Sequence, residues 1–237
     1  MKRQKLNLKY LHCGLSLFLI LGLFATGISR AQSPQGQVII TWQANNFYPA
    51  DYKGKALAVN QNTVTVAAEL LKNQKLQDLS KATITWFLDD DFLSSGTNLK
   101  ETTFRITKTK GDSHFVRAVV GLGAEEFEGT ISIPVFGPVV VIENPNPYPL
   151  VKGETQLSLR AIPYFFNITG LNDLTLRWQI NNGQPIYKSG FDNEIVLNIG
   201  SPQQGASNKI NVTVFAQNQK NLLETNQAAI NLEVTQP

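Results

Sequence analysis

Two short stretches of sequence, ITWFLDDD (residues 84–91) and LTLRWQINN (residues 174–182), decide the fold. In each, apolar and polar residues alternate around a tryptophan, and Asp or Asn residues follow. Alternation with period two indicates a half-buried antiparallel strand, and Asp and Asn favour a turn after it. The stretches therefore predict the same strand and hairpin turn in two related domains. We expect Trp86 and Trp178 to be the central core residues of those domains.

The same alternation runs through most of the chain and indicates an all-β protein without a convincing helical period. The sets expected to face inward in the first half are Val64, Val66, Ala68 and Leu70; Ile84, Trp86 and Leu88; Phe104 and Ile106; Val116, Ala118 and Val120; and Ile131, Ile133 and Val135. The sets in the second half are Leu157, Leu159 and Ala161; Leu174, Leu176, Trp178 and Ile180; Ile195, Leu197 and Ile199; Ile210, Val212 and Val214; and Ile230, Leu232 and Val234.

An internal repeat supports a duplication. NFYP (residues 46–49) recurs as NPYP (residues 146–149), and KG (residues 53–54) recurs at residues 152–153. The period is about 100 residues, the size of one sandwich domain. Residues 143–147 are proline-rich and are expected to interrupt a strand. We therefore predict two tandem antiparallel immunoglobulin-like β-sandwich domains, residues 32–142 and 143–237, with the boundary near Ile142.

The first 31 residues have the pattern of a secretory signal peptide. Basic residues at positions 2, 3, 5 and 9 precede an almost uninterrupted apolar run from Leu15 to Ile28, and small residues frame Arg30. We expect cleavage after Ala31 and an exported protein, placed in the periplasm, at the cell surface or outside the cell. The alternative is an uncleaved membrane anchor, although the run falls short of the roughly 20 apolar residues that cross a bilayer.

Cleavage would change the charge of the protein. The whole chain has 21 Lys and Arg and 18 Asp and Glu, and five of the basic residues lie in the signal, so the mature part has 16 minus 18, or −2. Its charges are spread without a basic stripe, which argues against nucleic acid as a partner. Cys13, the only cysteine, leaves with the signal, so we expect no thiolate metal site and no disulfide.

The residues quoted so far carry a resemblance. A tryptophan in the third strand, facing small and branched residues some 20 positions earlier, is similar to the core of immunoglobulin-like and PKD-like sandwiches. Residues 46–70, 84–91 and 161–182 resemble uncharacterised exported bacterial envelope proteins with two such domains. The resemblance implies an envelope location and supplies no activity.

The mature sequence offers little for catalysis. His114 is its only histidine, so a Ser-His-Asp or Cys-His arrangement is not indicated. We expect His114 to be an ordinary strand residue and the protein not to be an enzyme. Glu125, Glu126 and Glu128 form an acidic cluster that a glycoside hydrolase could use as paired carboxylates. Glycines flank the cluster, so we favour a solvated hairpin and keep a hydrolase as the least favoured alternative. No cofactor is expected.

Asp89, Asp90 and Asp91 form the weak candidate metal site of the sequence. Three carboxylates in a row are ligands that Ca²⁺ accepts. In the second half, however, Asn181, Asn182 and Gly183 occupy the corresponding positions, and these are turn residues. We therefore favour a hairpin turn over a metal site.

One candidate binding surface follows from strand parity. If residues 157, 159, 161 and 165 face inward, then Ile162, Tyr164 and Phe166 point outward together, which is typical of an interface with a partner or a neighbouring domain. The alternative is that Pro163 introduces a bulge and buries both rings. The leading functional hypothesis is a non-enzymatic adhesion, scaffold or spacer protein that binds an envelope protein or polysaccharide. The second is a carbohydrate-binding module in which Tyr148, Tyr164 and Phe166 stack on sugar rings.

Overall fold

A computed structural model describes residues 36–146, 148–201 and 209–235 of the chain, which belong to one compact unit that begins at Gly36. These residues form strands and one short 3-10 helix, η3 (Leu171–Asp173). Within this part of the chain, no helix has the length and apolar character needed to span a membrane. The expected signal peptide, residues 1–31, lies outside the described residues.

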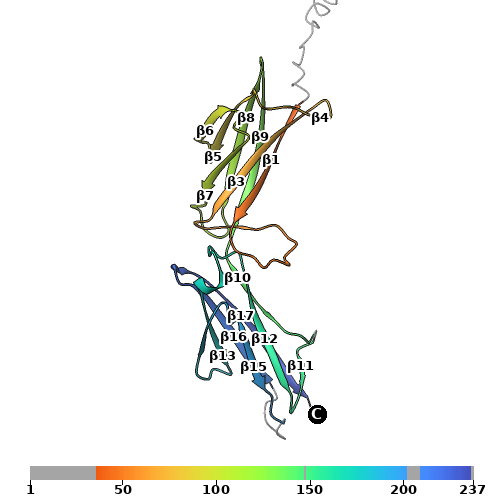
Figure 1. Ribbon diagram of the computed structural model, residues 1–237, viewed down its shortest axis with the longest axis vertical. Helices are drawn as coiled ribbons and strands as arrows, with labels where there is room; N and C mark the ends of the chain where they lie inside the picture. The colour runs from red at the N-terminus through yellow and green to blue at the C-terminus, as the bar shows by residue number, and fades with distance from the viewer. Residues whose placement is uncertain (1–35, 147, 202–208, 236–237) are drawn as a thin grey trace, which may run out of the picture. The chain divides into compact units, whose positions relative to one another are not determined.

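The first sandwich consists of two sheets (Figure 1). Its strands are β1 (Gly36–Asn45), β2 (Ala58–Val59), β3 (Thr63–Lys72), β4 (Lys75–Leu76), β5 (Thr83–Leu88), β6 (Asp91–Thr97), β7 (Glu101–Arg105), β8 (Ser113–Leu122) and β9 (Glu125–Phe136). One sheet has the order β1-β3-β4, with β7 also paired to β3, and the other has the order β2-β9-β8-β5-β6. All pairs are antiparallel except β2 with β9.

The second sandwich repeats this plan. Its strands are β10 (Val139–Glu143), β11 (Leu150–Lys152), β12 (Gln156–Tyr164), β13 (Leu174–Ile180), β14 (Ile186–Ser189), β15 (Glu194–Asn198), β16 (Lys209–Asn218) and β17 (Asn221–Thr235). The sheet orders are β10-β12-β15 and β11-β17-β16-β13-β14. Again one short strand, β11, pairs in parallel with the last strand, β17.

The strand orders confirm the predicted fold class of tandem immunoglobulin-like sandwiches. In both domains a sheet built on the first long strand faces a five-stranded sheet in which the tryptophan strand, β5 or β13, lies next to the edge strand. The repeated NFYP and NPYP segments follow equivalent strands, β1 and β10, and precede the short parallel strands β2 and β11. The duplication in sequence is therefore a duplication in structure.

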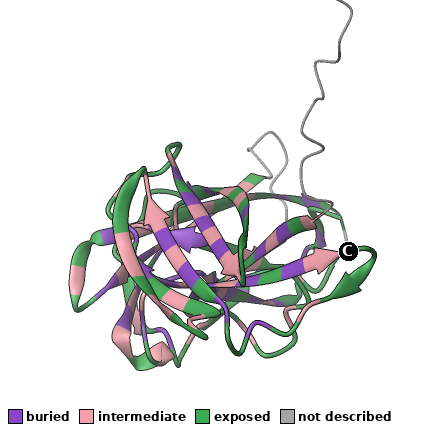
Figure 2. Ribbon diagram, turned by 90° about the horizontal axis from the view of Figure 1, so that it is seen from above, coloured by how far each residue is buried: buried purple, intermediate pink, exposed green. Residues whose placement is uncertain are grey.

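Each sandwich buries its own apolar core. Buried residues alternate with exposed or half-buried ones along the strands, as Figure 2 shows. Trp86 lies in the first core and Trp178 in the second, and neither side chain is exposed. The two rings differ in one respect. Trp86 Nε1 donates to the backbone oxygen of Leu99 (2.9 Å), whereas Trp178 Nε1 is buried without a hydrogen-bond partner among the described residues.

The chain passes from one sandwich to the other earlier than the expected boundary near Ile142. β10 begins at Val139 and pairs with β12, and Val140 is buried in the second core. Gly137 and Pro138 separate β9 from β10. Residues 144–146 follow β10 and precede β11, so they belong to the second sandwich, and Pro145 lies outside the strands, as expected for a residue that cannot donate to a strand ladder.

The residues after each tryptophan strand form matching hairpin turns. Asp89 and Asp90 have φ of 51° and 71°, and Asn181 and Asn182 have φ of 47° and 59°. Two successive residues with positive φ are typical of the tight hairpin turn that matches the twist of paired strands, and Asp and Asn adopt this conformation readily. The acidic run is thus part of a turn, as the comparison of the two halves predicted.

The difference between the two tryptophans gives a prediction. Trp86→Phe and Trp178→Phe remove the same volume, but the first also deprives the Leu99 oxygen of its donor, while the second removes a donor that is already unpaired. Trp86→Phe should therefore lower the free energy of unfolding by about 1 kcal/mol more than Trp178→Phe. Urea unfolding of both variants, followed by circular dichroism, measures the difference. The reverse ranking would contradict this account of the two cores.

Candidate functional site

Segments of both sandwiches meet around Phe47, which follows β1. The Phe47 N–H donates to the backbone oxygen of Phe166 (2.9 Å), and the Phe165 N–H donates to the backbone oxygen of Phe47 (2.6 Å). The half-buried Phe47 ring packs against the core of the second sandwich. Tyr52, in the same connection, contacts the rings of Tyr164 and Phe165 edge-on, with centroids 5.5 and 5.6 Å apart. The two domains therefore share backbone pairing as well as side-chain packing.

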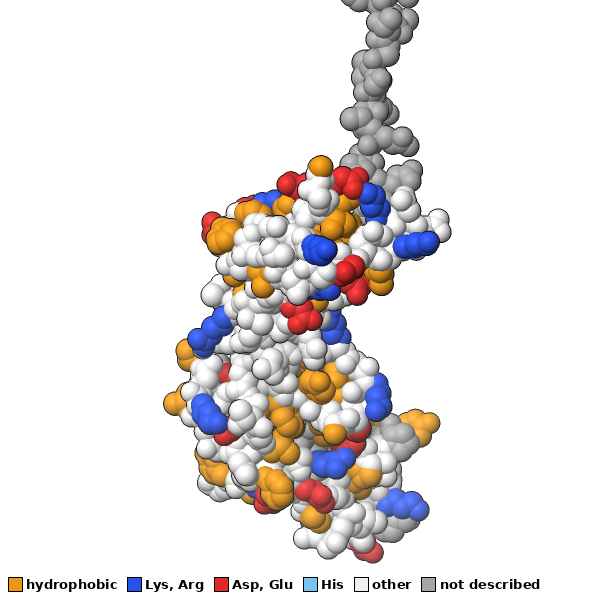
Figure 3. Space-filling view, turned by 45° about the horizontal axis from the view of Figure 1, so that its top comes forward, with side chains coloured by type: hydrophobic (Ala, Val, Ile, Leu, Met, Phe, Trp, Pro, Cys, Tyr) orange, Lys and Arg blue, Asp and Glu red, His pale blue; other side chains and the backbone are white. Residues whose placement is uncertain are grey.

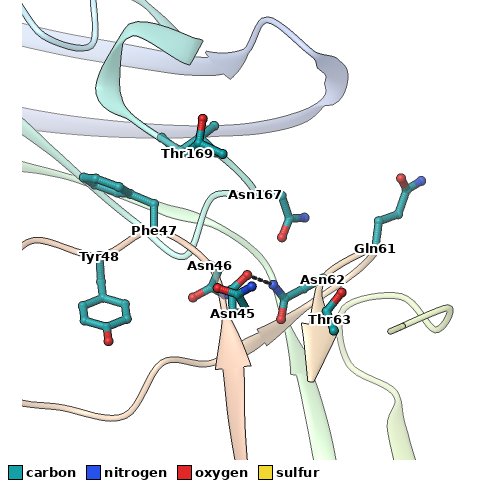
Figure 4. A pocket seen from close by; sticks show the side chains of 10 residues that line it. Asn45, Asn46, Phe47, Tyr48, Gln61, Asn62, Thr63, Asn167 and Thr169 are labelled. Carbon is teal, nitrogen blue, oxygen red and sulfur yellow. Dashed lines mark hydrogen bonds between the residues drawn. The ribbon is translucent and has the colours of Figure 1, made fainter. Parts of the chain in front are cut away.

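Next to this contact lies a pocket of about 540 Å³ (Figure 4). Its walls come from the end of β1, the turn between β2 and β3, and the segment after β12. The described residues that line it are Asn45, Asn46, Phe47, Tyr48, Gln61, Asn62, Thr63, Asn167, Ile168 and Thr169. Amide and hydroxyl side chains dominate this list, and none of the ten is charged.

Three asparagines fix the walls by donating from their amide nitrogens to backbone oxygens. Asn46 donates to Leu57 (2.7 Å), and Asn62 donates to Asn45. Asn167 reaches across to the first sandwich and donates to the backbone oxygen of Asn60 (2.9 Å). Figure 4 shows Asn62 turned towards Asn45, with Asn167 on the facing segment. Each asparagine thus holds a loop that strand pairing leaves unsupported.

The amide oxygens of the same three side chains have no partner in the part of the chain that the structure describes. Asn46 Oδ1, Asn62 Oδ1 and Asn167 Oδ1 are buried and receive no hydrogen bond from the described residues. Asn62 as a whole is only 2% exposed. A buried acceptor without a donor costs free energy, and native structures rarely keep one without a reason. Three of them around one pocket make this wall rich in unused acceptors.

A buried carboxylate holds the second-sandwich side of the pocket. Glu224 on β17 accepts from the backbone N–H of Asn167 (2.8 Å) and from Asn218 Nδ2 (2.6 Å). Asn218 Nδ2 also donates to the backbone oxygen of Asn167 (3.1 Å). Burial raises the pKa of Glu224, and the two hydrogen bonds to its carboxylate offset the rise only in part. The segment that carries Asn167 is therefore fixed from both sides.

Thr169, at the rim, belongs to a small ionic cluster. Its hydroxyl donates to Asp173 Oδ2 (2.9 Å), and Lys220 contacts Asp173 Oδ1 (2.8 Å). The hydrogen bond from Lys220, with those from the N–H and hydroxyl of Thr169, lowers the pKa of Asp173 to about 2. The carboxylate is consequently ionised and keeps Thr169 in place.

The structure separates the residues of the predicted outward patch. Ile162 and Tyr164 are half-buried, Phe166 is fully buried in the second core, and Tyr148 is 71% exposed elsewhere. The outward position expected for Phe166 was wrong because Phe165 has a φ of 63°, and this left-handed residue breaks the alternation after β12. Pro163 does not cause the break, since the register between β10 and β12 is continuous across it. Tyr164 contacts the Tyr52 ring of the first sandwich, whereas Phe166 contacts that sandwich through its backbone oxygen, which accepts from the Phe47 N–H.

His114, expected to be an ordinary strand residue, has a carboxylate partner that the sequence did not reveal. The side chain is 1% exposed; its Nε2 accepts from the Thr107 N–H (3.3 Å), so Nδ1 carries the proton and donates to Asp89 Oδ2 (2.6 Å). Asp89 Oδ1 also accepts from Lys108 Nζ (2.8 Å) and from the Phe115 N–H (2.9 Å). Both ring nitrogens are therefore engaged in holding loops together.

The other acidic candidates lie apart from the pocket. Asp90 and Asp91 are exposed, and no group of three or more potential metal ligands occurs in the described ranges. Glu125 pairs with Lys72, Glu128 lies 3.4 Å from Arg117, and Glu126 is exposed on β9. The glutamates therefore lie on a hairpin, as favoured from the sequence.

The cluster around Asp89 predicts a pH-dependent stability. Burial raises the pKa of Asp89, but hydrogen bonds from Lys108, the Phe115 N–H and His114 outweigh it, and the net pKa is lowered. The ionised carboxylate therefore stabilises the fold above the unfolded-state pKa, and this stabilisation is lost as the pH falls through the folded-state pKa.

Asp89→Asn should lower the free energy of unfolding by about 1–3 kcal/mol near neutral pH, since hydrogen bonds to a charged acceptor are lost. The difference from wild type should shrink well below the ordinary Asp pKa of about 3.9. Chemical denaturation of both proteins, near neutral pH and well below the ordinary Asp pKa, measures this difference in the free energy of unfolding. Asp90→Asn in the same turn is the control and should change little; a constant difference at both pH values would refute the role of ionised Asp89.

No family model matches the chain, and no curated protein matches it. Similar solved structures include three N-terminal domains of the bacteriophage RB49 highly immunogenic outer capsid protein (TM-score 0.42, 14% identity, 84% of this chain and 59% of that one). The fibronectin(III)-like modules of Clostridium thermocellum CbhA are also similar (TM-score 0.29, 13% identity, 84% of this chain and 95% of that one). So are Sidekick-1 immunoglobulin domains 1–5 (TM-score 0.30, 16% identity, 89% of this chain and 41% of that one). This chain thus spans less than two thirds of the phage chain, and its own strand order remains the basis of the fold assignment.

Proposed function

We propose that the chain is a non-enzymatic immunoglobulin-like scaffold or adhesion protein that is exported to the cell envelope. The observation that carries this proposal is the junction, where Phe47 pairs with Phe166 through the backbone and packs its half-buried ring against the second core. A spacer needs its domains coupled in this way, because domains joined only by a linker move independently.

Exposed aromatic side chains on the sandwiches support the adhesion part of the proposal. On the first sandwich, Phe92 is 67% and Phe115 is 55% exposed, and Phe92 contacts Phe87 edge-on with centroids 6.4 Å apart. The guanidinium of Arg117 lies 3.9 Å from the centre of the Phe87 ring. These residue types support an adhesion surface, because aromatic residues and Arg are enriched where proteins bind one another. Figure 3 shows acidic and basic side chains interspersed on the face that it displays.

The coupling of the sandwiches can be tested with Phe47→Ala. Although Phe47 belongs to the first sandwich in sequence, its loss should lower the free energy of unfolding of the second sandwich by about 2 kcal/mol, less than a fully buried Phe because the ring is half-buried. Hydrogen exchange of β12, β13 and β16 amides reports on that sandwich specifically. Phe92→Ala, which removes the same ring from a more exposed position on the first sandwich, is the control. Unchanged exchange in Phe47→Ala would refute the coupling.

Export can be tested independently. When the full chain is expressed in a bacterium, the intact mass of the envelope fraction should correspond to a protein that begins at Gln32. Replacing Ala31 with a bulky residue should block processing, because the peptidase reads small residues there. A protein that retains Met1 and stays in the cytoplasm would refute export, and one that retains Met1 in the membrane would replace the cleaved signal by an anchor.

A further inference from the structure

We propose that the pocket between Asn62 and Asn167 binds a neutral, hydroxyl-rich ligand, of which an oligosaccharide is the biological class. The inference goes beyond a scaffold role. It rests on the chemistry of the pocket wall, and it moves the carbohydrate hypothesis from Tyr148, Tyr164 and Phe166 to a different set of residues.

The unused groups of the wall are acceptors. Asn46, Asn62 and Asn167 each donate from the amide nitrogen to a backbone oxygen, and their amide oxygens are buried without a donor among the described residues. All three residues line the pocket, so a bound ligand would reach these oxygens through a shift of the wall. What the wall lacks is donors, and hydroxyl groups supply them.

The absence of charge among the described lining residues selects the ligand class. A calcium site favours carboxylates among its oxygen ligands, and an anion requires basic residues or converging N–H donors, but this wall offers amides and hydroxyls. Tyr48 lines the pocket with a ring that is 37% exposed, and an aromatic face packs well on the apolar face of a sugar ring. A volume of about 540 Å³ suits a ligand of a few sugar units.

The ligand would contact both sandwiches. Asn46, Asn62 and Thr63 belong to the first, whereas Asn167 and Thr169 belong to the second. Binding therefore adds contacts that exist only while the two domains stay joined, and it favours the joined state by mass action.

The test is a titration of the isotopically labelled full chain with cellotetraose, chitotetraose and maltotetraose at millimolar concentrations. We expect at least one of them to shift the side-chain amide signals of Asn46, Asn62 and Asn167 in nitrogen–proton correlation spectra. Thr63→Val removes a rim hydroxyl while keeping a residue that suits a strand, and it should weaken binding by roughly tenfold. Thr41→Val, an exposed position on β1, is the matched control and should bind as wild type does.

Tyr48→Ala should also weaken binding, whereas Tyr187→Ala on β14, whose ring is 65% exposed, should not. The proposal is overturned if none of the three sugars shifts the pocket amides, or if the shifts fall on other exposed aromatic residues. It is also overturned if calcium chloride alone produces the shifts, since the wall would then be a cation site. Export and domain coupling are measured separately, so failure here leaves the scaffold proposal standing.

Discussion

The two-way backbone pairing of Phe47 with Phe165 and Phe166 is the contact on which the rest of the junction depends. The connection from β1 to β2 runs from residue 46 to residue 57, and a loop of that length leaves many backbone groups without strand partners. Pairing with the second sandwich satisfies two of them and packs the Phe47 ring against an apolar core. Beside this pairing, Tyr52 packs against Tyr164 and Phe165 of the second sandwich, and Phe47 itself lines the pocket.

The left-handed conformation of Phe165 makes this pairing possible. A residue with a φ of 63° reverses the direction of the side chains that follow it, so Phe165 and Phe166 are both buried instead of alternating. A bulky residue in this region carries strain, which the surrounding packing must offset. The edge-on contacts of Tyr52 with Tyr164 and Phe165, together with the Glu224 hydrogen bond at Asn167, are contacts of that kind.

The sequence predicts features that depend on neighbouring residues, but it does not reveal contacts between residues far apart in the chain. The strands, their inward faces, the tryptophans and the turn at Asp89 all leave a signal within about ten residues, so alternation and turn composition could predict them. The pairing of Phe47 with Phe166, the bond from Asn167 to Asn60 and the bond from His114 to Asp89 join positions far apart in the chain. Nothing in a period-two pattern records them. The repeat even concealed the junction, because NFYP and NPYP look equivalent in sequence and give no sign that Phe47 of the first segment pairs with Phe166 of the other sandwich.

The comparison of the two turns shows how one plan acquired different chemistry. Asp89 accepts from the Phe115 N–H, and Asn181 accepts from the Asn211 N–H (2.8 Å) in the matching position of the second sandwich. The carboxylate can accept from Lys108 and His114 as well, whereas an amide oxygen serves fewer donors. At the junction, Asn46, Asn62 and Asn167 donate from their amide nitrogens to backbone oxygens, and their amide oxygens have no partner among the described residues. Only the bond from Asn167 to Asn60 joins the two sandwiches, whereas the other two hold loops of the first. The same side chains therefore hold the pocket wall in place and supply its acceptors, which are the groups that the proposed oligosaccharide would meet.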